Sequence, residues 1–139
     1  MTAPKPAYEI AAGSFVTLEL DGSRALCLKA ERIGKEHTNH FLVVLEPRPE
    51  PGHMALRYID PELPLIPVDG VALAFTDGPE RTPPEIGDAF ANRTGLMLKV
   101  KDDAKSQRYC SYVEIATGLV RPRMEHGIIR LMGWSVQRL

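Results

Sequence analysis

The stretch SFVTLELDGSRALCLKA, residues 14–30, decides the fold of this chain. Apolar side chains stand at every second position on either side of the dipeptide Asp21-Gly22. They are Val16, Leu18 and Leu20 before the dipeptide, and Leu26 and Leu28 after it. A period of two is typical of a strand with one buried face, and Asp-Gly is a residue pair that closes tight hairpins. The stretch therefore predicts an antiparallel β-hairpin.

The same alternation recurs along most of the chain, with further Asp-Gly turns between the apolar runs. We expect strands at residues 14–20, 24–30, 40–46, 54–59, 71–75, 96–101, 108–115, 119–124, 128–132 and 134–138. Only residues 31–37 and 85–91 are compatible with a helical turn, and the glycines at 34 and 87 disfavour both. The sequence predicts an all-β antiparallel fold, either a small barrel or two pseudo-repeated half-barrels, with at most one or two short helical turns.

The chain has 139 residues, of which 44% are apolar, and this composition excludes a wholly disordered protein. A chain of this size buries about two-thirds of its unfolded surface, so its stability requires neither a disulfide framework nor a structural metal. We expect one compact all-β domain over residues 1–139.

Prolines divide this domain into blocks. Six of the 12 prolines lie between residues 47 and 67. Because proline has no backbone N–H for a sheet, we expect this stretch to be an extended loop or a sheet edge, and not a central strand. The segment TDGPERTPP, residues 76–84, is the expected boundary loop.

A weak internal repeat accompanies the strands. Shifting the sequence by 70 residues aligns residues 13–69 with residues 83–139 and gives seven identical pairs. Three of these pairs are Leu28 with Leu98, Lys29 with Lys99, and Val43 with Val113. At this shift apolar positions align with apolar positions, as is expected of two copies of one sheet unit. The alternative is two unrelated strand-rich segments, which a suitable shift can bring into phase.

The charges nearly cancel over the whole chain, with 17 Lys and Arg against 18 Asp and Glu. This balance gives no overall attraction to nucleic acid or to an anionic membrane. Residues 1–92 carry 8 basic and 14 acidic side chains, whereas residues 93–139 carry 9 basic and 4 acidic ones. This difference in charge between the two halves is compatible with docking on a polar partner or with contact between the halves. The alternative is that the surface charges have no functional pattern.

The basic residues of the C-terminal third are the strongest candidates for binding. Lys99 and Lys101 share one face of a predicted strand, as do Arg121 and Arg123. Tyrosines and a tryptophan lie nearby in the sequence, and small β-barrels that hold single-stranded nucleic acid combine such groups. The alternative is that these four cations are ordinary outward positions of alternating strands.

The sequence carries no signature of catalysis, of a metal site or of a bound cofactor. The motifs GxSxG, GxxxxGK[ST] and GxGxxG are absent. His37 and His40 stand three residues apart, but no CxxC, HExxH or HxH motif supplies further ligands, so we interpret them as loop histidines. We therefore predict no catalytic residue, no metal and no cofactor.

Compartment and thiol state follow from local composition. Residues 1–15 lack the apolar core of a secretory signal, and the longest apolar runs, Phe41–Leu45 and Val71–Phe75, are too short to span a membrane. A soluble cytoplasmic protein is expected. Cys27 and Cys110 are then expected to be two buried thiols, with a disulfide between them as the alternative.

Three functions follow from these observations. The first is a non-catalytic cytosolic binding module that recognises a protein partner through its polarised charge and exposed sheet edges. The alternatives are nucleic-acid binding through Lys99, Lys101, Arg121 and Arg123, and an enzyme or small-ligand carrier whose pocket is assembled from scattered residues. An unprotected edge such as residues 128–138 also allows a twofold homodimer.

Overall fold

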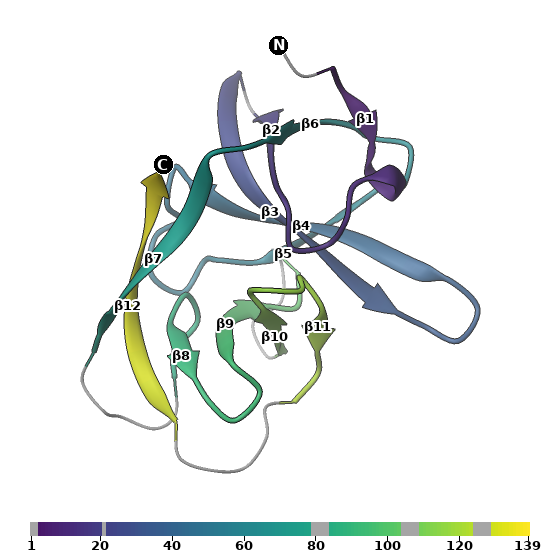
Figure 1. The fold of residues 1–139 in the computed structure, drawn as a ribbon. Coiled ribbons are helices and arrows are strands. Elements are labelled where there is room, and N and C mark those ends of the chain that lie inside the picture. Colours follow the sequence, from purple (N-terminus) through teal and green to yellow (C-terminus); the bar gives the residue numbers. More distant parts are fainter. Residues whose placement is uncertain (1–2, 21, 79–83, 104–108, 124–128) are drawn as a thin grey trace.

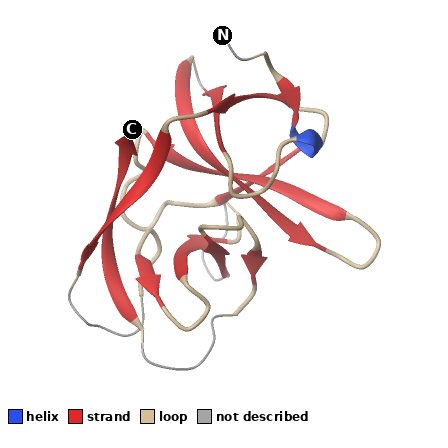
Figure 2. Ribbon diagram, in the orientation of Figure 1, coloured by secondary structure: helices blue, strands red, loops and turns tan. Residues whose placement is uncertain are grey.

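The computed structural model describes residues 3–20, 22–78, 84–103, 109–123 and 129–139, and the regular structure of these residues is almost entirely strand (Figure 2). The first six strands are β1 (Lys5–Pro6), β2 (Phe15–Leu20), β3 (Ser23–Ile33), β4 (Thr38–Glu46), β5 (Leu56–Ile59) and β6 (Pro64–Val68). The other six are β7 (Val71–Asp77), β8 (Ala89–Ala91), β9 (Leu96–Lys101), β10 (Cys110–Glu114), β11 (Val120–Arg121) and β12 (Arg130–Arg138). A single 3₁₀ turn, η1 (Ala7–Glu9), is the one helical element of the described residues. No helix within these ranges is long and apolar enough to cross a membrane.

The strands form two antiparallel sheets of six strands each (Figure 1). The N-terminal sheet has the order β1-β6-β2-β3-β4-β5, and the C-terminal sheet has the order β7-β12-β8-β9-β10-β11. The antiparallel all-β prediction is therefore confirmed. In neither sheet do the first and last strands of the order pair within the described residues, so the predicted closed barrel is not confirmed.

Both sheets have the same strand order, and their central strands also share one register. Leu28 faces Val43 across β3 and β4, as Leu98 faces Val113 across β9 and β10. These positions match at the sequence shift of 70 residues. The first hairpins differ in length, because Phe15 pairs with Leu28 but Ala89 pairs with Leu98. The repeat of residues 13–69 in residues 83–139 stays a prediction.

The apolar side chains fall into three clusters that explain why β3 and β4 are apolar on both faces. The largest cluster lies between the sheets, with Leu28 and Val43 facing Leu98 and Val113. A second cluster lies on the opposite face of the N-terminal sheet and includes Cys27 and other side chains from β2 to β6. A smaller third cluster lies on the corresponding face of the C-terminal sheet. Because β3 and β4 pack on both faces, the run Phe41–Leu45 is uninterrupted.

The two sheets are joined by backbone contacts as well as by the shared core. The N–H of Glu31 donates to the carbonyl of Gly118, and the N–H of Lys101 donates to the carbonyl of Met54. Gly118 has a φ of +71° and lies against the backbone of Gly13, where a Cβ would have no room. The geometry therefore requires glycine at position 118.

Neither of the two segments considered for a helical turn, 31–37 and 85–91, is helical. Residues 31–33 end β3 and residues 34–37 form the turn to β4, because Ile33 pairs with Thr38 and extends the hairpin. Residues 85–88 form a turn in which the carboxylate of Asp88 accepts the N–H of Glu85, and β8 follows directly.

The proline-rich stretch contains β5, which is a sheet edge as predicted, and β6, which lies between β1 and β2 in the sheet order but pairs with only one of them at each residue. Pro64 pairs only with β1, whereas Pro67 pairs only with β2. Each proline therefore has a neighbouring strand on one side, and its missing N–H costs no ladder bond on the other.

The edge predicted at residues 128–138 stays a prediction, because the described residues of β12 other than Met132 are paired with a neighbouring strand on one side only. β12 pairs with β8 at residues 130–132 and with β7 at residues 132–138. The strand forms one continuous element through Gly133, and the outer strand of this sheet is β7. The boundary loop predicted at 76–84 is partly β7, and its residues 79–83 lie outside the described residues.

Candidate functional site

The structure brings two of the four predicted basic residues into one row. Lys99 faces Tyr112 across β9 and β10, and Tyr112 faces Arg121 across β10 and β11. Directly paired residues point to the same face, so the tyrosine lies between the two cations. Lys101 lies on the same strand face as Lys99, whereas Arg123 is exposed beyond the end of β11.

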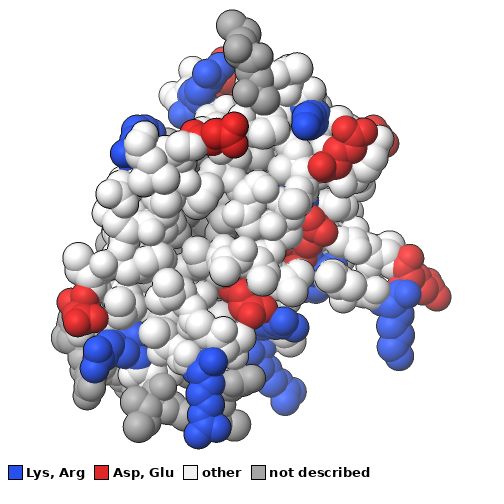
Figure 3. All heavy atoms as spheres, in the orientation of Figure 1, with Lys and Arg blue, Asp and Glu red and all other residues white. Residues whose placement is uncertain are grey.

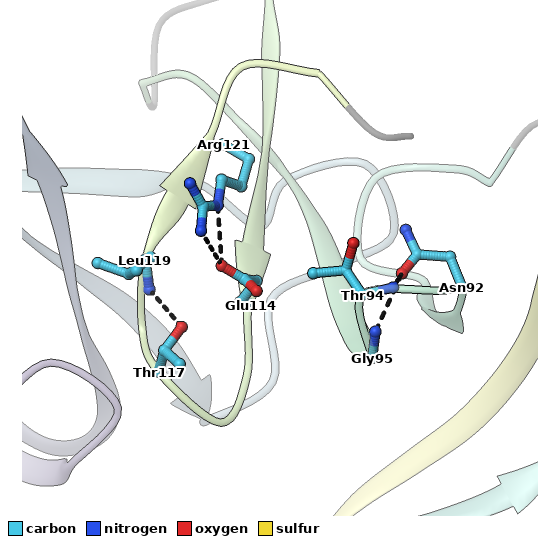
Figure 4. Close-up of polar contacts among 7 residues, drawn as sticks. All are labelled: Asn92, Thr94, Gly95, Glu114, Thr117, Leu119 and Arg121. Carbon is cyan, nitrogen blue, oxygen red and sulfur yellow. Dashed lines mark hydrogen bonds and ion pairs between the residues drawn. The ribbon is translucent and has the colours of Figure 1, made fainter. Parts of the chain in front are cut away.

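Both cations of that row already have partners within the chain. The Lys99 ammonium donates to the carbonyl of Pro84 at 2.8 Å. The Arg121 guanidinium donates to the carboxylate of Glu114 through Nε and Nη2, each at 2.8 Å (Figure 4). On the face shown in Figure 3, acidic and basic side chains are interspersed. Charge pairing of this kind weakens a phosphate-binding surface, because each cation must leave its partner first.

The two histidines considered for metal binding are separated by the hairpin. His37 is exposed in the turn, whereas His40 is buried on β4. Within the described ranges no group of three or more His, Cys, Asp or Glu side chains is placed to hold a metal ion.

His40 instead belongs to a buried polar cluster on the second core face. The fully buried Lys29 donates to His40 Nδ1 at 2.9 Å and to the carboxylate of Glu31 at 3.0 Å, with the Ile10 carbonyl at 3.4 Å. Burial and the Lys29 ammonium lower the pKa of His40, and Glu31 opposes them only in part. The neutral imidazole thus accepts a hydrogen bond from the lysine. The cluster supplies hydrogen-bond acceptors to the buried Lys29 ammonium, whose burial without such partners would destabilise the fold.

A groove of about 570 Å³ opens at the opposite end of the same sheet face. We call it the N-terminal groove. It is lined by residues of the β2–β3 hairpin, β4, the following loop and the start of β5. They are Leu20, Ser23, Ala25, Val44, Pro47, Arg48, Pro49, Glu50, His53, Ala55 and Arg57. Its volume lies within the range of binding pockets, about 300 to 1,000 Å³.

The loop of residues 47–53 is held in place by one arginine. The guanidinium of Arg48 lies over the indole ring of Trp134, 3.7 Å from its centroid, and donates to the Trp134 carbonyl at 2.9 Å. The indole N–H donates in turn to the carbonyl of Gly87 at 2.9 Å. A cation–π contact combined with two hydrogen bonds gives the wall of the groove a fixed position.

Arg57 is the groove residue with the clearest capacity to bind. It follows the buried Leu56 on β5, pairs with Leu42 across the sheet, and has an exposed side chain. Burial raises the pKa of the Cys27 thiol to about 11, and the positive charge of Arg57 lowers that pKa in part. Among the described residues no ion pair or hydrogen bond engages the Arg57 guanidinium. An exposed guanidinium above the apolar Val44 and Ala55 can bind a carboxylate in two-pronged geometry.

The thiols differ from each other. Both cysteines are free, but Cys27 is fully buried and Cys110 is half-buried, so the prediction of two buried thiols is wrong for Cys110. The Cys110 Sγ lies 4.0 Å from the hydroxyl of Tyr112.

Sequence reasoning missed the groove altogether. Its two arginines, Arg48 and Arg57, belong to the acidic part of the chain and stand apart from the basic cluster of the C-terminal third. The available signal was that Arg57 breaks the apolar run of a strand between two proline-rich segments. Comparison with protein-family models, with curated proteins and with solved structures finds no match to this chain.

Proposed function

We propose that this protein is a non-catalytic binding module that recognises a segment of a protein partner at the N-terminal groove. The observation that carries the proposal is one open groove that combines an apolar floor with Arg57, whose guanidinium no described residue engages. Interface centres of this kind combine burial of apolar side chains with arginine contacts. An extended segment that presents apolar and acidic side chains side by side fits this lining.

The nucleic-acid function stays an alternative with less support. Two of its four predicted residues, Lys99 and Arg121, are engaged within the chain, as described above. Phosphate binding through Lys101 and Arg123 alone would show a shallow salt dependence, because the slope follows the number of phosphates neutralised.

The small-ligand carrier is the other alternative, and the same groove would hold its ligand. The groove is open to solvent on one side, and its wall comes from a loop, which suits a segment of a larger partner more than an enclosed small molecule. Binding measurements with both kinds of probe separate the two functions.

The test is a titration of fluorescent peptides with the protein, followed by fluorescence anisotropy. A peptide of alternating Leu and Glu is expected to bind saturably, and Arg57→Ala is expected to weaken it about tenfold, since a charged hydrogen-bonding partner is lost. The control is Arg93→Ala, because Arg93 is an exposed arginine outside the groove and the variant should bind as the wild type does. Absence of saturable binding up to about 1 mM for Leu/Glu, Leu/Gln and Leu/Lys peptides alike overturns the proposal.

A further inference from the structure

The shared register of the two sheets makes each groove residue comparable with one residue of the C-terminal sheet. Val43 and Val113 occupy the same position, as shown by their pairing with Leu28 and Leu98. Val43 in turn faces Leu56, and Val113 faces Val120. The next residue along β5 is Arg57 and the next along β11 is Arg121. The two arginines are therefore equivalent by position.

Two residues beyond the positions that pair with these arginines, on the same strand faces, the two sheets differ in one decisive respect. In the C-terminal sheet the position after Val113 is Glu114, whose Oε2 binds both Nε and Nη2 of Arg121 at 2.8 Å (Figure 4). The carboxylate is largely covered, because the Glu114 side chain is only 13% exposed. In the N-terminal sheet the equivalent position is Val44, which is 8% exposed and lines the groove beside Arg57. A methyl group thus stands where the other sheet has a carboxylate.

The remaining charged groups of the groove do not replace that carboxylate. Glu50 lines the groove from the loop, but the described residues hold no ion pair between it and Arg57. His53 and Arg48 are the other ionisable lining residues, and neither supplies a negative charge. No described residue therefore supplies a carboxylate to the exposed Arg57.

We propose that a carboxylate of the bound partner occupies, against Arg57, the place that Glu114 occupies against Arg121. This inference rests on the function proposed above and specifies the chemistry of the partner. The partner group is an Asp or Glu side chain, or a chain-terminal carboxylate, and an apolar neighbour of that group packs on Val44 and Ala55. Two charge-assisted hydrogen bonds from one guanidinium explain why a carboxylate is preferred over a neutral amide.

The experiment installs the missing carboxylate in the protein. Val44→Glu is expected to pair with Arg57 within the chain and to weaken binding of the Leu/Glu peptide at least about tenfold, whereas the isosteric control Val44→Gln is expected to weaken it less. The probes are the Leu/Glu peptide, the Leu/Gln peptide and hexanoate. Wild-type protein is expected to prefer Leu/Glu over Leu/Gln by about tenfold. In Arg57→Gln this preference is expected to disappear, a result that does not depend on the folding of either Val44 variant.

The outcomes separate this inference from the proposed function. If Leu/Glu and Leu/Gln bind equally well to the wild type, the carboxylate inference is overturned and the binding module stands. If hexanoate binds at Arg57 and no peptide does, the carboxylate inference stands and the protein-partner function is overturned in favour of a small-ligand carrier. If neither peptide nor hexanoate binds, both proposals are wrong.

Discussion

Replacing Gly118 by alanine tests how the two sheets are joined. A Cβ at this position would clash with the backbone nitrogen of Gly13 and would lie 2.6 Å from the Lys29 carbonyl oxygen and 2.8 Å from the Ala12 carbonyl carbon. All three neighbours are backbone atoms, so no side chain can rotate away. The left-handed φ of +71° costs an alanine about 1 to 2 kcal/mol, and the forced backbone shift costs about 1 to 3 kcal/mol more. We therefore expect Gly118→Ala to lower the free energy of unfolding by about 3 kcal/mol.

Urea denaturation followed by the fluorescence of Trp134 measures this loss. With a slope of about 2 kcal/mol per molar urea, the midpoint is expected to fall by about 1.5 M. The matched control is Gly22→Ala, because Gly22 has a φ of +79° but no atom within 4 Å of its Cβ position. The control is expected to lose only the cost of the left-handed backbone, about 1 to 2 kcal/mol. Equal midpoints for the two variants would refute the close contact between the sheets.

Three further outcomes follow from the described contacts. The pKa of His40 is lower in the folded than in the unfolded chain, so the unfolded chain takes up the proton first as the pH falls. The contribution of His40 to the free energy of unfolding is therefore full above about pH 6.5 and is lost as the pH falls below that value. In urea titrations at several pH values, His40→Gln should flatten this dependence. Ser111→Ala should lower the free energy of unfolding by about 1 kcal/mol in the same denaturation assay and should raise the pKa of Asp102 toward its usual value, because the Ser111 hydroxyl donates to that carboxylate at 2.8 Å. Iodoacetamide near pH 8 should modify Cys110 before Cys27, since Cys27 is buried and has its pKa raised to about 11; mass spectrometry of the digested protein reads the order, and faster labelling of Cys27 would contradict its burial.

The strands themselves were predictable because alternation and turn chemistry act locally. The hairpin of residues 14–30 formed as expected, with Val16 facing Cys27 across it, because its apolar period and its turn agree. β6 was not predicted, since Pro64 and Pro67 oppose a strand locally. It forms because β1 pairs with residues 64–65 and β2 pairs with residues 66–68, a division between two partner strands that the sequence pattern does not indicate. The short β8 was missed for a related reason, because its three residues gain stability from pairing with β9 and β12.

The candidate site was harder to predict than the fold. Residue type and spacing singled out Lys99 and Arg121 among the basic residues, but they could not show that the Pro84 carbonyl and Glu114 engage these cations. The groove gathers residues from β2 to β5, and the binding proposed for it rests on Arg57 having no counterpart of the carboxylate that Arg121 has. That difference becomes visible only when the two sheets are compared in register.

The central claim is that Arg57 receives a carboxylate from the partner. The most direct measurement is the Nε–H resonance of Arg57 in nitrogen-15 NMR spectra during titration with the Leu/Glu peptide. This resonance is expected to shift saturably in the wild type, as an arginine that gains a carboxylate does, while that of Arg121 stays in place because Glu114 already holds it. A peptide that binds and shifts Arg121 but leaves Arg57 unmoved would contradict the claim.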